Sequence, residues 1–403
     1  MQKIVNQRHS KSSFYHLLSR FFERSAYYGL RSSLILYMVG TTLNMSREDA
    51  LSIYGFSTIC LIFTQIFGAL IGDLLLNNKR AIILGGLLQA LGAFILCYPS
   101  VSSIYIGGSI ILLGGGLYTP NIISSFGKQY LHNTKLLDSG FTMFHLVINL
   151  GSFIGIVAIA YIGEKFGYTY SFITAGLVYL ISIIFILISK DKNQEAIINQ
   201  KFNGIQIVKV LAAILIVGFF WSAYEISGGR IYSIPMDFAT QKVSSIPADF
   251  WSSLNFYCVI IIGVFLIIFW SKYYSSRFMK LAFGFLIGAI AFSIMLLIPE
   301  ETTEKDVILY IISMFLLTAS ELYVAPVINS IITKNTNPKY LAIVISLIFL
   351  PSRAISYLVG FGNDYFYDNP SVSIIISLIA FIAISIGIFI MIFVNKNYLQ
   401  QRV

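Results

Sequence analysis

Charged residues are scarce in this sequence. Asp, Glu, Lys and Arg make up 11% of its 403 residues, whereas a typical soluble domain carries roughly 25%. By contrast, 57% of the residues are hydrophobic, and the mean hydropathy is +0.80. A soluble core cannot bury this much apolar sequence, but a lipid bilayer can accept it. The composition therefore argues against a soluble enzyme and favours an all-α membrane protein.

Residues suited to metal or nucleotide chemistry are also few. The three cysteines lie inside apolar runs, and their odd number and spacing indicate buried thiols rather than a metal site: Cys60, Cys97 and Cys258. The four histidines show no metal-site spacing either: His9, His16, His132 and His145. No phosphate-binding loop of the Walker type is present, which argues against ATP as the energy source. We therefore expect no metal site.

Apolar runs of membrane-spanning length fill most of the chain. Each approaches or exceeds the ~20 residues needed to cross a bilayer. The first set falls near 13–41, 50–76, 81–98, 103–131, 141–163 and 168–189. The second set falls near 206–227, 250–271, 280–298, 307–333, 341–361 and 372–394.

Two polar stretches interrupt these runs, and they set the expected domain organisation. The polar segment Lys190–Lys209 separates the two sets, and a further polar loop covers residues 228–248. We expect 12 transmembrane helices in two six-helix, pseudo-symmetric halves. The expected parts are an N-terminal bundle at 1–195, a cytoplasmic linker at 196–205 and a C-terminal bundle at 206–403.

The net charge of +9 follows membrane topology rather than a nucleic-acid surface. If the N-terminus is cytoplasmic, eighteen of the 27 Lys and Arg residues fall in cytoplasmic segments and five on the opposite side. Lys and Arg are enriched in cytoplasmic loops of membrane proteins. We therefore expect a multi-pass protein of the cell (inner or plasma) membrane with both termini in the cytoplasm, and no nucleic-acid partner.

Four arginines and three glutamates fall within the predicted spans: Arg20, Glu23, Arg24, Arg31, Glu225, Glu321 and Arg353. A charge in hydrocarbon costs at least ~2.5–3.5 kcal/mol on insertion scales, so such residues usually face a cavity and have partners. One alternative for Arg20 is that it snorkels to the cytoplasmic surface. One alternative for Glu225 and Glu321 is a purely structural role. A proton or substrate site is the interpretation that we favour.

Short motifs run in order from about residue 15 to about residue 360. They are F-E-R-S-A-Y-Y-G-L-R at 22–31, G-A-L-I-G-D at 68–73, F-H-L-V-I-N-L-G-S at 144–152, F-W-S-A-Y-E at 220–225, S-L-N at 253–255 and E-L-Y-V-A-P at 321–326. Spans four and ten also share a proline near their middle, Pro120 and Pro326, as parallel repeats would. Together these motifs resemble the proton-dependent oligopeptide transporter (POT/PTR) family of the major facilitator superfamily.

The resemblance implies a fold and an activity. The fold would be the major facilitator fold, with two halves around a cavity that opens alternately to each side. The activity would be proton-coupled symport of di- and tripeptides, driven by the proton gradient without a cofactor, and the protein would not be an enzyme. We expect a monomer whose partners are a small-molecule substrate, protons and the lipid bilayer.

The resemblance also assigns roles to single residues. Arg31 would bind the substrate carboxylate, and Glu321 would bind the substrate amine. Four more residues would complete the pocket, although the two aromatic ones equally fit ordinary packing: Tyr28, Asn149, Trp221 and Asn255. Glu225 would pair with Arg31 and carry the coupled proton. The neighbouring Glu23 and Arg24 would belong to the same proton-coupling group.

Five positions depart from the family pattern. Arg20 replaces the first glutamate of the span-one signature, Thr119 replaces a lysine, Ile62 replaces a tyrosine, Phe256 replaces the proline after the span-eight L-N, and Arg353 stands where a charge is unusual. We expect Arg20 and Thr119 to be compensatory changes, and Arg353 to compete for Glu321.

The departures change the expected charge of the cavity. Glu23 would face two arginines, and such a net positive cluster in a low dielectric favours an anionic group. Two alternatives to peptide symport therefore stay open. One is a transporter of the same fold for another small zwitterionic or anionic solute, such as an amino acid, nitrate or a drug. The other is a membrane protein of this fold that does not transport.

Overall fold

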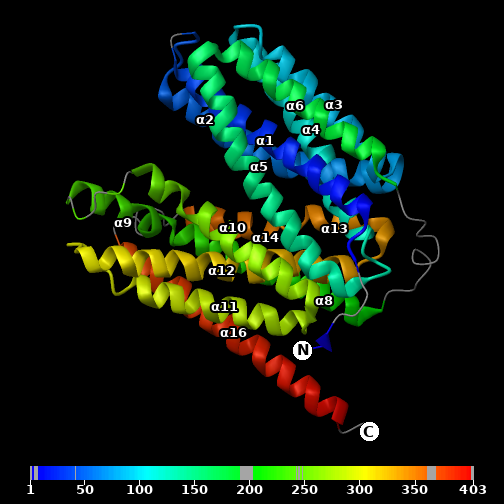
Figure 1. The fold of residues 1–403 in the computed structure, drawn as a ribbon, viewed down its shortest axis with the longest axis vertical. Coiled ribbons are helices and arrows are strands. Elements are labelled where there is room, and N and C mark those ends of the chain that lie inside the picture. Colours follow the sequence, from blue (N-terminus) through cyan, green and yellow to red (C-terminus); the bar gives the residue numbers. More distant parts are fainter. Residues whose placement is uncertain are drawn as a thin grey trace.

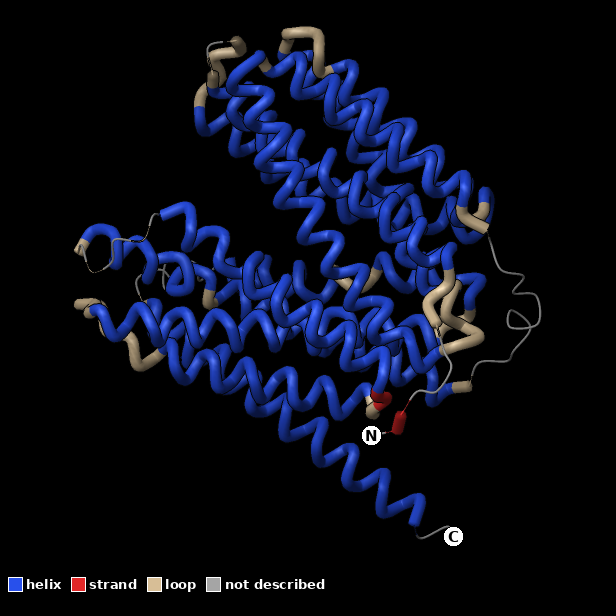
Figure 2. Tube along the Cα trace, viewed as in Figure 1, coloured by secondary structure: helices blue, strands red, loops and turns tan. Residues whose placement is uncertain are grey.

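The computed structural model describes residues 2–3, 8–40, 42–190, 203–241, 243, 246, 248–360 and 369–400. These residues are almost entirely helical, and the helices gather into two bundles (Figures 1 and 2). The exceptions include two short strands, β1 (Gln2–Lys3) and β2 (Tyr273–Tyr274), which pair antiparallel. Most of the predicted linker at 196–205 lies outside the described residues.

The first bundle covers residues 11–188. Its elements are α1 (Lys11–Val39), α2 (Arg47–Ile71), the π-helical turn η1 (Gly72–Leu76), α3 (Asn78–Ile95), α4 (Val101–Lys128), the 3-10 turn η2 (Thr134–Leu136), α5 (Leu137–Phe166) and α6 (Tyr168–Ile188). Polar caps start several of these helices: the Ser10 side chain accepts a hydrogen bond at the start of α1, and Ser46 does so for α2.

The second bundle begins at residue 204. Its elements are α8 (Gly204–Ile226), α9 (Gly228–Thr240), α10 (Ala248–Lys272), α11 (Arg277–Met295), α12 (Glu304–Asn335), the 3-10 turn η3 (Pro338–Tyr340), α13 (Leu341–Ser346), α14 (Leu350–Gly360) and α16 (Pro370–Gln400). Capping boxes start α8 at Asn203 and α12 at Thr303.

The predicted all-α membrane fold is confirmed. Each predicted span begins within four residues of an observed helix start. Among the described residues, ten helical segments are long and apolar enough to cross a membrane. Helices α1 and α3 fall outside that set: α1 carries four charges in its interior, and α3 opens on Lys79 and Arg80. The exact count of twelve spans therefore stays a prediction.

Glycine contacts hold the first bundle together. Gly85 and Gly92 of α3 lie against the backbone of α4 and leave no room for a side chain. A Cβ atom at either position would lie only 2.6 Å from a backbone carbonyl oxygen, that of Gly114 or of Gly107. Small residues let helix backbones approach closely where lipid supplies no hydrophobic drive. Gly114 and Gly107 therefore serve the close packing of α3 on α4.

Two local features of the second bundle differ from expectation. The predicted 228–248 loop contains the helix α9, because Ile231, Ile234 and Phe238 recur at helical spacing and are buried. The predicted single span at 341–361 is divided into α13 and α14. Pro351 explains the break, because its ring clashes with the carbonyl of the residue four positions earlier.

The two bundles touch along only part of their length. Contacts across the interface join α5 to α10 and α12, and join α13 to α2 and α4. Figure 1 shows the bundles close together around α13 and the start of α8, and diverging towards α9. We call these the linker end and the α9 end. The bundles are therefore in contact at the linker end and lie further apart at the α9 end.

Candidate functional site

Glu23 is the centre of a buried charge cluster on α1. Its carboxylate accepts hydrogen bonds from Arg20 Nη1 at 2.9 Å and from Arg24 Nε and Nη2 at 2.7 and 2.6 Å. Gln89 of α3 donates a fourth bond at 3.1 Å. Glu23 is 0% exposed, and the two arginines are 3% and 8% exposed. The cluster thus holds two cations on one carboxylate, as the sequence predicted, whereas Gln89 was missed.

Arg20 and Thr119 are in contact. Arg20 Nη1 lies 3.3 Å from the Thr119 hydroxyl oxygen, across the interface between α1 and α4. The Arg20 guanidinium also lies 5.7 Å from the centre of the Phe144 ring. The alternative that Arg20 snorkels to the surface is therefore wrong: Glu23 binds its guanidinium head inside the bundle, and the residue is only 3% exposed.

Arg31 lies two turns beyond Arg24 and meets neutral groups. Its guanidinium lies 4.1 Å from the centre of the Tyr54 ring, and Nη2 lies 3.5 Å from the Thr58 hydroxyl. A small cavity of about 70 Å³ opens beside these three residues. None of the ion pairs among the described residues includes Arg31. Tyr28 instead lies against Arg24, with the guanidinium 5.6 Å from its ring centre.

The expected pair between Glu225 and Arg31 is wrong for this structure. Glu225 Oε1 lies 3.7 Å from Arg353 Nη1, and the two side chains are 50% and 47% exposed. The reason is geometric: α8 and α14 are neighbours in the second bundle, whereas Arg31 belongs to the first bundle, which diverges at this end. The half-exposed side chains of Glu225 and Arg353 agree with the separation of the two bundles towards the α9 end.

Glu321 does not pair with Arg353 either. Its carboxylate lies 2.9 Å from Nε2 of His145 on α5, so this contact joins the two bundles. Glu321 is 6% exposed. His145 was not among the predicted site residues, because histidine spacing was compared only with that of metal sites. A better signal was its place one turn before Asn149, whose side-chain amide donates to the His145 carbonyl at 3.1 Å.

The remaining predicted pocket residues lie on the second bundle. The Asn255 side-chain oxygen accepts a bond from the Thr318 hydroxyl at 2.7 Å. Trp221 packs against Phe220 and Tyr224, with ring centres 5.3 and 5.9 Å apart.

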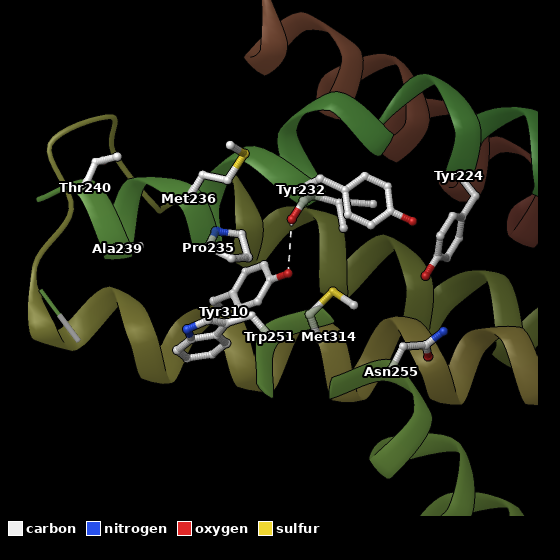
Figure 3. Close-up of a pocket in the computed structure, with 11 residues that line it drawn as sticks. Tyr224, Tyr232, Pro235, Met236, Ala239, Thr240, Trp251, Asn255, Tyr310 and Met314 are labelled. Carbon is white, nitrogen blue, oxygen red and sulfur yellow. Dashed lines mark hydrogen bonds between the residues drawn. The ribbon is translucent and has the colours of Figure 1, made fainter. Parts of the chain in front are cut away.

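An open cavity of about 470 Å³ lies beside Asn255 (Figure 3). Tyr224, Trp251, Tyr310 and Met314 are among its lining residues, and no charged side chain lines it in the described part of the chain. The cavity therefore suits an apolar group.

The linker end carries a second buried cluster that sequence analysis did not single out. Asp138, at the start of α5, accepts bonds from Arg277 Nε at 2.6 Å and Lys280 Nζ at 2.5 Å, both on α11. All three are buried. Nearby, Asp73 accepts the backbone N–H of Ile343 at 3.0 Å. Both contacts join the two bundles and hold the linker end closed.

Two bundles of long apolar helices, with ionisable residues between and within them, are the architecture of a membrane transporter. Residues 17–361 match the Major Facilitator Superfamily, and the chain belongs to that superfamily. The superfamily expected from the motifs is thus confirmed.

Relatives extend this result. The chain is 29% identical to the dipeptide and tripeptide permease A of Citrobacter koseri over 213 residues, which are 52% of this chain and 42% of the relative. It is 33% identical to the protein of the same name from Chromobacterium violaceum over 183 residues, 44% of this chain and 37% of the relative. The matches thus span less than half the length of these curated relatives.

Solved structures agree at the level of the fold. A POT family transporter in complex with 5-aminolevulinic acid has a TM-score of 0.63 and 18% identity, with 96% of this chain and 98% of that chain covered. A peptide transporter POT in complex with sulfate has a TM-score of 0.61 and 18% identity, with 96% and 97% covered. The predicted resemblance to the POT family is confirmed as a similarity of sequence and fold.

Proposed function

We propose that this protein is a proton-coupled symporter of small peptides that works by alternating access. The observation that carries the proposal is Arg31. Its charge lies within a span, beside a small cavity, against the neutral Tyr54 and Thr58. A cation in such a place is costly unless an anion meets it. A substrate carboxylate would supply that anion.

The two bundles would divide the substrate between them. Arg31 in the first bundle would take the carboxylate, and Glu321 in the second would take the amine. Asn149 and Asn255 would add hydrogen bonds, and both lie beside groups of this site. Tyr28 and Trp221 would form part of the wall. The 470 Å³ cavity beside Asn255 offers room for an apolar side chain of the substrate.

Proton coupling would rest on Glu225, with Glu23 and Arg24, together with Arg20, as a fixed background of net positive charge. Glu225 is half-exposed, and its carboxylate lies 3.7 Å from Arg353 Nη1, so water can reach it and exchange protons with it. Glu23, which is 0% exposed and held by two arginines, would instead keep its charge. We assign the titrating role to Glu225 for this reason.

We further propose a plasma-membrane location, with the linker end and both termini in the cytoplasm, and a monomeric carrier. The basic side chains of Lys128, Arg277, Lys280 and Lys334 gather at the linker end. The acidic start of α12 lies at the opposite end. Lys and Arg favour the cytoplasmic side of membranes. The structure would then represent the outward-facing state.

Uptake into proteoliposomes tests the proposal. Labelled dialanine should accumulate when the outside is acidic, and accumulation should stop when a protonophore removes the gradient. The variant Arg31→Gln should lose uptake, whereas Arg80→Gln, an exposed arginine at the linker end, should keep it. Uptake that ignores the gradient would contradict proton coupling.

The excess of positive charge around Glu23 favours one alternative, a carrier for an anionic solute. Competition separates the two ideas. If nitrate or a monocarboxylate blocks binding while dialanine does not, the substrate is an anion rather than a peptide. If no solute moves in any gradient, the protein does not transport.

A further inference from the structure

The cavity beside Asn255 is lined largely by aromatic and aliphatic side chains of the second bundle. It has a volume of about 470 Å³ and lies between α8, α9, α10 and α12 (Figure 3). Tyr224, Trp251 and Tyr310 give it aromatic faces, and Met314 gives it a flexible aliphatic one. An apolar cavity of about 150 Å³ already suffices to bind benzene. The cavity therefore has room for a phenyl or an indole ring.

Two polar groups on the cavity wall are already bonded within the protein. The Tyr310 hydroxyl donates to the Ile231 carbonyl at 3.0 Å, and the Asn255 side-chain oxygen accepts from the Thr318 hydroxyl at 2.7 Å. The described residues that line the cavity include no charged side chain. A charged group that entered it would lose its hydration without gaining a counter-ion. The cavity therefore suits an uncharged, apolar or aromatic side chain of a ligand.

The α9 wall of the cavity is held in place without a ligand. The buried Arg230 donates from Nη2 to the backbone carbonyls of Ile298 and Pro299 at 3.1 and 3.0 Å, in the segment between α11 and α12. The bond from Tyr310 to Ile231 ties α9 to α12 as well. A preformed site costs less ordering on binding than one that the ligand must assemble. The cavity is therefore ready to receive a side chain.

The cavity adjoins the carboxylate to which we assign the substrate amine. Met314, Thr318 and Glu321 follow one another on α12 at helical spacing, so they share one face of the helix. The helix rises about 10 Å from Met314 to Glu321, and its side chains lean back towards its N-terminus, which is the cavity side. Tyr224 connects the two places, because it lines the cavity and lies within electrostatic range of Glu321.

We propose that this cavity binds the side chain of the first residue of a peptide and selects a large aromatic or apolar side chain there. That side chain is attached to the carbon atom that carries the amine, so it starts beside Glu321. The peptide carboxylate points the other way, towards Arg31 in the first bundle, and takes the second residue with it. The inference rests on the proposed peptide symport and on the amine-binding role of Glu321.

Three dipeptides test the idea by calorimetric binding to the purified, full-length protein. Phe-Ala and Ala-Phe have the same composition and charge and differ only in which residue carries the ring, and dialanine is the reference. Phe-Ala should bind at least about tenfold more tightly than Ala-Phe, because burial of a phenyl side chain contributes at least that factor. Ala-Phe should bind about as tightly as dialanine.

A variant that fills the cavity shows whether the preference arises there. Met314→Trp should bring the affinity ratio of Phe-Ala to Ala-Phe close to one, because the indole occupies the space that the ligand ring would take. Ile308→Trp makes the same change elsewhere on α12, where the side chain is 61% exposed, and should keep the wild-type ratio. If Met314→Trp does not fold, Met314→Ala gives the opposite test: the enlarged cavity should raise the affinity for Trp-Ala relative to Phe-Ala.

The outcomes separate this inference from the proposed function. Equal affinities for Phe-Ala and Ala-Phe, or a preference for Ala-Phe, would overturn the inference and leave the cavity to another occupant, such as a lipid chain, while peptide binding itself would stand. An unchanged ratio in the Met314 variant that folds would overturn it as well. If none of the three dipeptides binds, the proposed peptide function fails, and this inference fails with it.

Discussion

The two bundles hold their charges in opposite ways. In the first bundle, Glu23 is fully buried and bound by two arginines and a glutamine. In the second, Glu225 and Arg353 are half-exposed and 3.7 Å apart. A buried network resists change because breaking it leaves a bare charge, whereas an exposed pair is weak and screened. In the proposed function, the first bundle would thus provide a fixed charge background, and the second would provide the group that changes its charge.

The largest expected effect comes from disrupting the buried charge network of the first bundle. Glu23→Gln should cost about 3–5 kcal/mol of unfolding free energy, because it leaves two buried arginines without their counter-ion. Glu225→Gln is the matched control, and its cost should stay below about 1 kcal/mol. Chemical unfolding of both variants in detergent decides the point. Equal losses would show that burial does not distinguish the two sites.

The next effect concerns transport rather than stability. Glu225→Gln should abolish uptake that is driven by a pH gradient while it spares counterflow, because exchange of substrate does not require the coupling proton. Arg353→Gln should reduce driven uptake less, since Arg353 only biases the charge of Glu225. Driven uptake that survives in Glu225→Gln would remove Glu225 from the coupling step.

A smaller effect tests the contact between Arg20 and Thr119. Arg20→Glu should stop transport, because it places two acids against Arg24 alone. Adding Thr119→Lys should restore part of the activity by returning a cation to the same spot, since the two side chains are 3.3 Å apart. If the double variant loses activity additively, the two positions are not coupled.

The smallest effect concerns α9. The Tyr310 hydroxyl donates to the Ile231 carbonyl at 3.0 Å (Figure 3). Tyr310→Phe should therefore lower the unfolding free energy by about 1 kcal/mol, the value of one buried hydrogen bond. Tyr232→Phe is the control, because Tyr232 is 70% exposed, and it should change nothing measurable. A larger loss in the control would mean that α9 is held from its outer face.

Much of the fold was predictable, because apolar run length is a strong signal in a membrane. The span starts near residues 13, 168 and 206 correspond to helix starts at Lys11, Tyr168 and Gly204. The neighbours of Glu23 were also predictable, since Arg20 and Arg24 lie three and one residues away on the same helix. Local spacing fixes such contacts directly.

Contacts between distant helices were not predictable in the same way. The pairs His145–Glu321 and Glu225–Arg353 depend on how each helix is rotated and on which end of the molecule is open. Neither quantity appears in a hydropathy pattern. The break before α14 was not predicted for a different reason. Pro351 is visible in the sequence, but its apolar neighbours make residues 341–361 look like one continuous span.

The contacts Gly85–Gly114 and Gly92–Gly107 have a mechanical consequence. With backbone against backbone, α3 and α4 cannot slide past each other without opening a gap along their whole length. These two helices should therefore move as one rigid pair. At the linker end of this pair, Asn78 of α3 donates a hydrogen bond to Asp73 at 2.9 Å, and Asp73 accepts the backbone N–H of Ile343 in the second bundle at 3.0 Å. A movement of α3 and α4 would therefore be transmitted to this contact, which must loosen before the linker end can open.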